Sequence, residues 1–346
     1  MGKFENSFAE LHGVKRALAT TSCTTAMHLM LVGLGIGPGD EVIVPSFTWV
    51  ATANVVLYCG ATPVLADVDP VTYNINLLDV ASRITERTKA IIVVHLFGLC
   101  VDVPRLKETV PPHILILEDC ACAAGATLNG IPAGGLGVAG AFSFHPRKSI
   151  TTGEGGMLTT NDLELANKLE ILRNHGASMS EEERHNGSSP YLLPDFNVLG
   201  FNYRMTDIQG AIGNVQLGKL NGFISERQKQ AEYYLDALSS IEWLRMPTVP
   251  SNGQHAWQSF VVFVREEASP VSRNVIMENL HSAGISSRPG THAIHMLRLY
   301  QERFGYADSD LPGAQLCSNQ TMAIPLHNKM DHDDLKFVVT TLKSIK

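Results

Sequence analysis

Lys148 is the residue whose surroundings in the sequence point most directly to chemistry. It lies in a loop rich in glycine and threonine, within AGAFSFHPRKSITTGEGGMLTTND, directly after an apolar segment at 139–145. A lysine amine that is partly removed from water loses basicity and becomes nucleophilic, as condensation with an aldehyde to a Schiff base requires. A solvated loop lysine is the alternative, and this residue alone does not decide between the two.

Two acidic residues, Glu118 and Asp119, follow the apolar run in ILILEDC at 114–120. A carboxylate among apolar residues needs a cation, several N–H donors or a protonated ligand as its partner. In open α/β sheets, ligands bind at the carboxyl ends of strands, which is where this segment places Asp119. A protonated pyridine nitrogen is a suitable partner for such a carboxylate.

A third candidate is the segment SCTTAMHLML, in which Ser22, Thr24 and Thr25 precede an apolar helical run and resemble N-cap residues. Backbone N–H groups at a helix start favour an anion, so a phosphate could bind there, although a capped buried helix without a ligand is the alternative. Taken together, the phosphate site, the strand-end Asp119 and the loop Lys148 form the set that pyridoxal phosphate needs.

Alternating apolar runs and helical patterns in the first two hundred residues predict the elements that position these groups. The runs lack polar alternation, which is typical of strands buried on both faces in a mainly parallel sheet covered by helices. Strands are predicted at 41–46, 63–69, 90–98, 114–120, 139–145 and 155–162. The sequence therefore predicts an α/β fold for this part of the chain.

The pattern becomes helical from about residue 204, with one continuous apolar face. This face comprises Ile208, Ala211, Ile212, Val215, Leu220, Ile224, Ala231, Leu235 and Leu238. A strand at 259–264 and helices at 272–283 and 331–345 then predict a smaller α+β domain. We expect two domains, a large one over 1–228 and a small C-terminal one over 229–346.

The composition excludes several classes of protein. With 45% hydrophobic residues, 18% charged residues and a formal net charge of −7, the chain is an ordinary globular protein without a basic stripe for nucleic acid. It contains no recognisable signal peptide and no run of 18 apolar residues, so we expect a cytoplasmic protein that does not bind membranes. The six cysteines lie mostly in apolar segments without zinc-ligand spacing, and we expect neither disulfides nor a metal site.

The chain resembles the DegT/DnrJ/EryC1/StrS family of sugar aminotransferases over most of residues 1–230. The segments that carry the resemblance include GIGPGDEVIVPSFTWVATAN, GATPVLADVD, LEDCACAAGA, FSFHPRKSITTGEGGMLTTND and GFNYRMTDIQGAIGNVQLGKL, in the expected order. The resemblance implies the aspartate aminotransferase fold (fold type I), pyridoxal 5'-phosphate (PLP) as cofactor, and a homodimer with active sites shared between subunits.

The resemblance assigns roles to the three candidate segments. It implies that Lys148 holds the cofactor as a Schiff base and that Asp119 pairs with the pyridine nitrogen. Thr24 and Thr25 match the family's phosphate-binding turn, and Ser143 matches a hydroxyl that contacts the same phosphate. These roles agree with the chemistry of the residues, because Asp119 keeps the ring protonated and Lys148 can carry the proton during the reaction.

Further positions match less completely. Trp49 matches an aromatic residue that stacks on the cofactor ring, with a core tryptophan as the alternative. Asn202 lies in a segment through which a neighbouring subunit completes the phosphate site, and Arg204 is an equal candidate there. Cys122 stands where the family commonly has glutamine to bind the cofactor's phenolic oxygen, and a thiol is a weaker donor. Relatives usually begin with about 20 to 30 further residues, and the sequence alone does not decide whether the natural protein or its gene model is truncated.

The expected reaction is transfer of an amino group from an amino acid, glutamate, to the 4-keto group of a nucleotide-diphosphate 6-deoxy sugar, as in perosamine synthases and similar enzymes. A sugar 3-aminotransferase and a non-catalytic, PLP-binding sensor are the alternatives. Lys148 argues against the sugar dehydratases of the family, which have histidine there. Arg288, His292 and His295 could line the sugar pocket, with surface or packing roles as the alternative.

Overall fold

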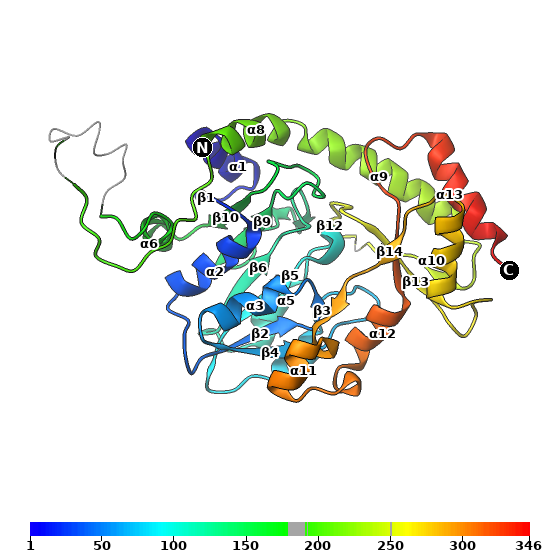
Figure 1. The fold of residues 1–346 in the computed structure, drawn as a ribbon, viewed down its shortest axis with the longest axis horizontal. Helices are drawn as coiled ribbons and strands as arrows, with labels where there is room; N and C mark the ends of the chain where they lie inside the picture. The colour runs from blue at the N-terminus through cyan, green and yellow to red at the C-terminus, as the bar shows by residue number, and fades with distance from the viewer. Residues whose placement is uncertain (179–190, 192, 250) are drawn as a thin grey trace.

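A computed structural model describes residues 1–178, 191, 193–249 and 251–346. Its central sheet is formed by β1 (Arg16–Thr20), β2 (Glu41–Pro45), β4 (Thr62–Ala66), β5 (Thr88–Val94), β6 (Leu115–Asp119), β9 (Ala139–Ser143) and β10 (Gly156–Thr160). The strand order is β1-β10-β9-β6-β5-β2-β4 (Figure 1). Only β10 is antiparallel to its neighbours, while the other paired strands are parallel. The predicted α/β fold with a mainly parallel sheet is confirmed.

The strands form where the sequence is apolar on both faces. All five residues of β2 and six of the seven residues of β5 are buried, as expected for strands covered on both sides. The six predicted strands of the large sheet all exist, within a few residues of their predicted ends. The sequence did not reveal β1, which forms an edge of the sheet and pairs with β10 from Arg16↔Thr160 to Thr20↔Gly156.

Two hydrophobic clusters cover the two faces of this sheet, because successive strand residues point to opposite sides. Leu117 of β6 joins one cluster and Ile116 joins the other. The helices of this part are α1 (Gly2–Leu11), α2 (Cys23–Gly33), α3 (Ala51–Tyr58), α4 (Leu77–Ser82), α5 (Val103–Thr109) and α6 (Leu163–Arg173). Residues of α2 pack in the Leu117 cluster, and residues of α1 pack in the Ile116 cluster.

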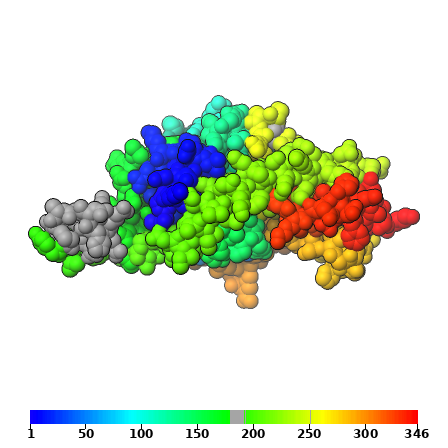
Figure 2. Space-filling view, turned by 90° about the horizontal axis from the view of Figure 1, so that it is seen from above, coloured from blue at the N-terminus to red at the C-terminus, as the bar shows by residue number. Residues whose placement is uncertain are grey.

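Two consecutive helices, α8 (Asp207–Leu217) and α9 (Leu220–Ala237), run from the large sheet to the C-terminal part (Figure 1). Figure 2 shows α1 and α8 side by side on one face of the molecule. The predicted apolar face is exposed on α8 and buried on α9. Ile208 and Val215 of α8 are 76% and 62% exposed, whereas Ile224 and Ala231 of α9 are buried. The apolar face of α8 therefore lies at the surface of the single chain.

The C-terminal part contains a four-stranded antiparallel sheet with its own hydrophobic core. Its strands are β11 (Leu244–Arg245), β13 (Phe260–Val264), β16 (Thr321–Ile324) and β14 (Arg288–Pro289), and its helices are α10 (Arg273–Ser282) and α13 (His332–Ser344). The strand and both helices predicted here exist, whereas β16 was not predicted. The expected boundary between residues 228 and 229 falls inside α9 and stays a prediction.

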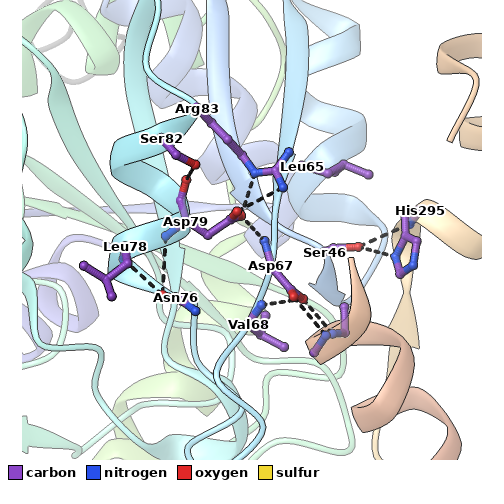
Figure 3. A network of polar contacts seen from close by, with 12 residues as sticks. Ser46, Leu65, Asp67, Val68, Asn76, Leu78, Asp79, Ser82, Arg83 and His295 are labelled. Atoms are coloured by element: carbon purple, nitrogen blue, oxygen red, sulfur yellow. Dashed lines mark hydrogen bonds and ion pairs between the residues drawn. The ribbon is translucent and has the colours of Figure 1, made fainter. Parts of the chain in front are cut away.

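Residues 290–320 pack against the large part of the chain and add a separate two-stranded sheet there. They contain β15 (His292–Ala293), α11 (Arg298–Phe304) and α12 (Pro312–Gln320), and β15 pairs with β3 (Phe47–Thr48). The carboxylate of Asp67 accepts hydrogen bonds from the backbone N–H groups of Gly313 (2.9 Å) and Ala314 (2.7 Å) at the start of α12 (Figure 3). A carboxylate at this position stabilises the helix start.

The remaining short elements are β7 (Thr127–Leu128), β8 (Ile131–Pro132) and β12 (Gly253–Gln254), which form a three-stranded sheet, and the 3-10 helices η1 (Leu96–Gly98), η2 (Ile294–Met296) and η3 (Asp308–Asp310). Within the described residues, we find no helix with the length and apolar character needed to span a membrane.

Candidate active site

The predicted site residues lie together at the end of the central sheet where the carboxyl ends of its parallel strands meet. Because β1, β2, β6 and β9 all point the same way, their carboxyl ends meet at this edge. Each strand end is followed by predicted site residues, namely Thr24 and Thr25 after β1, Trp49 after β2 and β3, Asp119 and Cys122 at the end of β6, and Ser143 and Lys148 at the end of β9. Ligand sites of α/β proteins form at such an edge.

Asp119 is only 4% exposed and is held in one orientation by hydrogen bonds. Its Oδ2 accepts from the hydroxyl of Thr52 at 2.8 Å, and its Oδ1 accepts from the backbone N–H of Ala121 at 3.0 Å. The Cys23 thiol lies 3.9 Å from Oδ1, and burial raises the pKa of this thiol well above its ordinary range. Cys23 therefore stays protonated beside the carboxylate. The sequence had not pointed to Thr52 or Cys23, because neither has a local signal apart from an apolar surrounding.

Lys148 is half-buried, and its Nζ donates a hydrogen bond to the Cys122 sulfur at 3.2 Å. Burial acts to lower the pKa of Lys148, but the Cys122 sulfur, which accepts its hydrogen bond, and the Asp119 carboxylate raise it more strongly. The pKa of Lys148 therefore lies above its ordinary value. This result corrects the expectation that desolvation makes this lysine less basic, since the neighbouring sulfur and carboxylate groups stabilise its charged form.

The start of α2 is capped by Ser22, one of the three predicted residues. The Ser22 hydroxyl accepts from the Thr25 N–H at 3.1 Å, and the Thr25 hydroxyl accepts from the Ser22 N–H at 3.0 Å, which forms a capping box. Thr24 and Thr25 thus lie in the first helical turn, and Thr25 is the N3 partner in the capping box, whereas Ser22 is the N-cap residue. Within the described residues, the N–H groups of Cys23 and Thr24 have no hydrogen-bond acceptor, as expected at a helix start that can bind an anion.

Gly156 explains how this helix start reaches the end of β9. A Cβ atom at Gly156 would lie 2.3 Å from the carbonyl carbon of Ser22, so only glycine lets α2 begin here. Gly156 pairs with Thr20 of β1 on one side and with Ser143 of β9 on the other. Ser143 therefore lies in the strand beside the helix start, as a shared phosphate site requires. The sequence contained this glycine in GEGG, but nothing in the local pattern singled it out.

Trp49 is 57% exposed, so the alternative of a core tryptophan is wrong. Its ring lies 5.5 Å from the ring of His292, centroid to centroid, in an arrangement fixed by pairing of the neighbouring Thr48 with His292. The position leaves the indole available to a ligand. Its stacking on a cofactor stays a prediction.

Asn202 and Arg204 are both exposed and lie beside the start of α2. Arg204 bridges to Thr20, and its guanidinium donates to the side-chain oxygen of Asn174 at 2.6 Å. Asn202 bridges to Asn174 through the backbone. The described part of the chain contains no hydrogen bond from either side chain to Lys148 or Asp119, and the choice between them stays open.

The three candidate sugar-pocket residues of the C-terminal part, Arg288, His292 and His295, have different environments. His295 is fully buried and accepts from the Ser46 hydroxyl at 2.7 Å (Figure 3). Its other ring nitrogen donates to the Asp308 carbonyl oxygen at 3.0 Å. It therefore packs η2 against β2 and does not line a pocket. Arg288 is exposed and donates to the Ser259 hydroxyl at 3.1 Å, and His292 is exposed beside Trp49. Only these two remain candidates for contact with a substrate.

Glu118 belongs to a separate buried group with His95 and Cys120, which is the one set of potential metal ligands among the described residues. His95 donates to Glu118 at 2.8 Å, and the other ring nitrogen of His95 accepts from the Val101 N–H at 3.0 Å. Glu118 also accepts from the N–H groups of Gly134 and Gly137. Both residues are satisfied by protein donors, so we interpret the group as a structural brace.

The residues present fit PLP. Within the described ranges, no cation lies at ion-pair distance from the Asp119 carboxylate, which is therefore free to accept from a protonated ring nitrogen. The Lys148 amine, with Cys122 as its partner, can hold an aldehyde. The start of α2 and the Ser143 hydroxyl offer N–H and O–H donors for a phosphate. These groups supply the set of contacts that binding of PLP requires.

Comparison with known proteins agrees with this geometry. The sequence profile of the DegT/DnrJ/EryC1/StrS aminotransferase family matches residues 1–343. A GDP-perosamine synthase from Caulobacter vibrioides is 41% identical over 345 residues, which cover 99% of this chain and 89% of the relative. An aminotransferase from Psychrobacter cryohalolentis has a TM-score of 0.94 at 31% identity, covering 99% of this chain and 90% of that structure. A putative sugar aminotransferase from Streptococcus pneumoniae in its PMP form has a TM-score of 0.93 at 28% identity, covering 99% and 91%, and its PLP form is also similar.

Proposed function

The chain belongs to the DegT/DnrJ/EryC1/StrS aminotransferase family, and on this basis we propose that it uses PLP to aminate a nucleotide-linked keto sugar. The amino donor in this proposal is an amino acid, glutamate, and the acceptor is the keto group of a nucleotide-diphosphate 6-deoxy sugar. The observation that carries the proposal is the arrangement of Lys148 and Asp119 at one sheet edge, beside the start of α2.

Asp119 and the start of α2 hold the cofactor at its two ends in this proposal. Asp119 accepts from the ring nitrogen and keeps it protonated, while Thr52 and Ala121 fix the carboxylate. The free N–H groups at the start of α2 and the Ser143 hydroxyl donate to the phosphate. When bound, PLP supplies an electron-withdrawing ring that stabilises negative charge on the carbon bearing the amine.

Lys148 has two tasks in the reaction. Its Nζ would hold the cofactor at rest and, once released, would take a proton from the α-carbon of the donor and pass it to the cofactor. In the second half-reaction it would take a proton back from the cofactor and place it on the sugar carbon. The raised pKa of Lys148 means that Nζ must first lose a proton, and the Cys122 sulfur accepts the hydrogen bond of this group at 3.2 Å. Cys122 thus takes the place that a glutamine commonly has in the family.

Amination at the 4-position of the sugar is the finer part of the proposal. It is supported by the relative named GDP-perosamine synthase, which is 41% identical over nearly the whole of this chain. Amination at the 3-position is the second candidate, since the residues that face the sugar, for which Arg288 and His292 are candidates, do not distinguish the two. The family resemblance does not settle this choice.

A homodimer is also part of the proposal. The exposed apolar face of α8 carries Ile208, Ile212 and Val215, which are 76%, 45% and 62% exposed. Contiguous apolar residues at a surface mark interaction sites, and a second copy of the chain is the occupant that we propose. Light scattering of the purified protein tests this, with a dimer mass for the native chain and a monomer mass for the double variant Ile208→Asp, Val215→Asp.

A panel of substrates tests the function. The protein is loaded with PLP and mixed with glutamate and with GDP-, UDP- or dTDP-linked 4-keto and 3-keto 6-deoxy sugars, and the products are analysed by mass spectrometry and NMR. We expect an amino group at carbon 4 of one such sugar. An amine at carbon 3 would favour the second candidate, and the lack of any amino sugar with every substrate would favour the sensor.

A further inference from the structure

The side chain of Gln258, from the segment between β12 and β13, brackets Lys148 on both sides. Its Oε1 accepts from the backbone N–H of Ser149 at 3.0 Å and from the Ser149 hydroxyl at 3.1 Å. Its Nε2 donates to the carbonyl oxygen of Arg147 at 2.8 Å. These backbone groups belong to the two peptide bonds that flank the Cα of Lys148. One amide side chain, 110 residues away in sequence, thus pairs with this lysine as a neighbouring strand would.

We call the hydrogen bonds of the Gln258 side chain to Arg147 and Ser149 the bracket. The other hydrogen bonds of the Lys148 loop do not replace it. The Lys148 N–H donates to His145 at 2.9 Å, and the Thr152 N–H donates to Phe144 at 3.0 Å, so both bonds join residues within the loop. Among the described residues, Gln258 is the one partner recorded for the Arg147 carbonyl and the Ser149 N–H. Within the described residues, the hydrogen bonds of Gln258 therefore connect the Lys148 loop to the C-terminal part of the chain.

Gln258 is itself held firmly enough to act as a fixed partner. Its backbone N–H donates to the Phe97 carbonyl at 3.0 Å. The guanidinium of Arg227, on α9, donates to the carbonyl of Trp257 at 2.9 Å and to that of Gln258 at 3.3 Å. Trp257 is fully buried and its Nε1 donates to Gln228 of α9 at 2.6 Å. Both sides of Gln258 are thus anchored before its side chain reaches Lys148.

Gly98 allows this segment to pass close to the site. Its φ is +105°, and a Cβ there would lie 3.0 Å from the Trp257 nitrogen and 3.1 Å from the carbonyl oxygen of Cys122. The segment that carries Gln258 and the backbone of Cys122 therefore both contact η1 at one glycine. Cys122 is the residue that receives the hydrogen bond of Lys148. The backbone of Lys148, through Gln258, and its amine, through Cys122, are consequently both held by segments that contact Gly98.

We propose that Gln258 is a positioning residue for Lys148, which fixes the backbone of this lysine so that Nζ stays directed at the Cys122 sulfur. Gln258 does not touch the reacting atoms. The consequence for the PLP-binding role rests on the function proposed above, whereas the constraint on the backbone does not. Loss of the bracket frees rotation about the backbone of Lys148, and an amine that samples several positions binds an aldehyde less tightly.

Hydrogen exchange of the protein without cofactor tests the backbone constraint. We compare Gln258→Ala with the native chain and with Gln301→Ala, a control in which a partly buried glutamine loses one bond to Asp308 on a different helix. Faster exchange by about tenfold or more is expected at the Ser149 N–H in Gln258→Ala only, as measured on peptides covering 144–150. Unchanged exchange at this peptide, in a variant with native thermal unfolding, would overturn the inference.

Binding of PLP tests the consequence for the lysine. We expect the Kd for PLP to rise about tenfold in Gln258→Ala, and the pH midpoint of the visible absorbance of the loaded protein to move, while Gln301→Ala matches the native chain. Gln258→Glu keeps the acceptor for Ser149 but turns an oxygen towards the Arg147 carbonyl, and serves as the second variant with a smaller effect on Ser149 exchange. A native Kd and midpoint in both Gln258 variants would contradict a positioning role. Failure of the native chain to bind PLP would instead contradict the proposed function, and the exchange experiment would still decide on the bracket.

Discussion

Glu118 and Asp119 are neighbours on β6, point to opposite faces of the sheet and have different roles there. Glu118 is fully buried and accepts from three protein donors, His95 at 2.8 Å, the N–H of Gly134 at 2.8 Å and that of Gly137 at 2.6 Å. Asp119 is nearly as buried, but among the described residues it accepts from the Thr52 hydroxyl, the Ala121 N–H and, at 3.9 Å, the weakly donating Cys23 thiol. It lies at the carboxyl end of β6, beside the loop that carries Lys148 after β9, and it acts on the charge of this lysine.

The difference shows how two buried carboxylates can be told apart. The Glu118 carboxylate is satisfied within the chain, and its partners join β6 to two loops, so its effect is on stability. The Asp119 carboxylate keeps room for a further donor, and a buried acceptor that is not fully satisfied marks a ligand site. We therefore expect substitutions on the Asp119 face to change activity and those on the Glu118 face to change stability.

The largest effect on the Asp119 face is expected from Lys148→Ala. Transamination should fall by about 10⁴-fold or more, because the variant loses both the amine that holds the cofactor and the group that moves the proton. Thermal unfolding of the protein without cofactor should change little, since Lys148 is half-buried and makes one side-chain bond. Steady-state kinetics and calorimetry measure the two quantities, and turnover close to the native rate would refute the role of this lysine.

Asp119→Asn should be the next largest. A neutral amide keeps the bonds to Thr52 and Ala121 in part but cannot balance the charge on a protonated ring nitrogen, so we expect kcat to fall by about 10²- to 10³-fold. The protein should still bind PLP. Native kinetics in this variant would contradict the pairing and would remove the distinction between the two faces.

Glu118→Gln is the matched substitution on the other face. The amide NH2 of the variant faces one of the donors that the carboxylate oxygen had accepted from, so the free energy of unfolding should fall by about 1–3 kcal/mol, as measured by urea denaturation. In the fraction that remains folded, kcat should stay within a few-fold of the native value. A loss of kcat as large as that of Asp119→Asn, without a loss of stability, would break the comparison.

Cys122→Ala sharpens the comparison through its pH dependence. The sulfur helps to raise the pKa of Lys148, so its removal should lower that pKa. PLP reacts with the neutral amine, and the pH profile of the loading rate should therefore shift to lower pH in the variant. Stopped-flow absorbance between pH 6 and 10 measures the shift, and a shift to higher pH would show that the sulfur does not stabilise the charged amine.

The smallest effect is expected on the Glu118 face, at His12. Burial lowers the pKa of this histidine to about 4 from 6.5. Between these two pH values the histidine is therefore protonated in the unfolded chain and neutral in the folded chain. Stability should consequently fall as the pH drops from 6.5 to 4, and His12→Phe, which keeps the stacking on Phe8, should reduce this fall. Urea denaturation at several pH values measures it, and an unchanged slope would place the acid sensitivity elsewhere.

The sequence was sufficient for the parts of the site that depend on strand ends. Apolar runs located β2, β5, β6 and β9, and the polar residues directly after them had to gather at one edge of a parallel sheet. Asp119 and Lys148 could be assigned for this reason. The edge strand β1 was missed because RALAT contains two alanines and one leucine and lacks the valine and isoleucine that marked most of the other runs.

Contacts between distant segments could not be predicted. Gln258 lies 110 residues from Lys148, and no local pattern marks a side chain that pairs with a remote loop. The direction of the pKa shift of Lys148 was also wrong at the sequence level, because it depends on the position of the Cys122 sulfur and not on burial alone. The exposed face of α8 has the same apolar pattern as the buried face of α9, so periodicity cannot distinguish them.

Borohydride reduction of the PLP-loaded protein, followed by peptide mass spectrometry, is the most direct test of the central claim. We predict a reduced pyridoxyl group on Lys148 and on no other lysine, and no adduct in Lys148→Ala. An adduct on a different residue of the native chain, or the lack of any adduct, would contradict the assignment of this lysine and the function built on it.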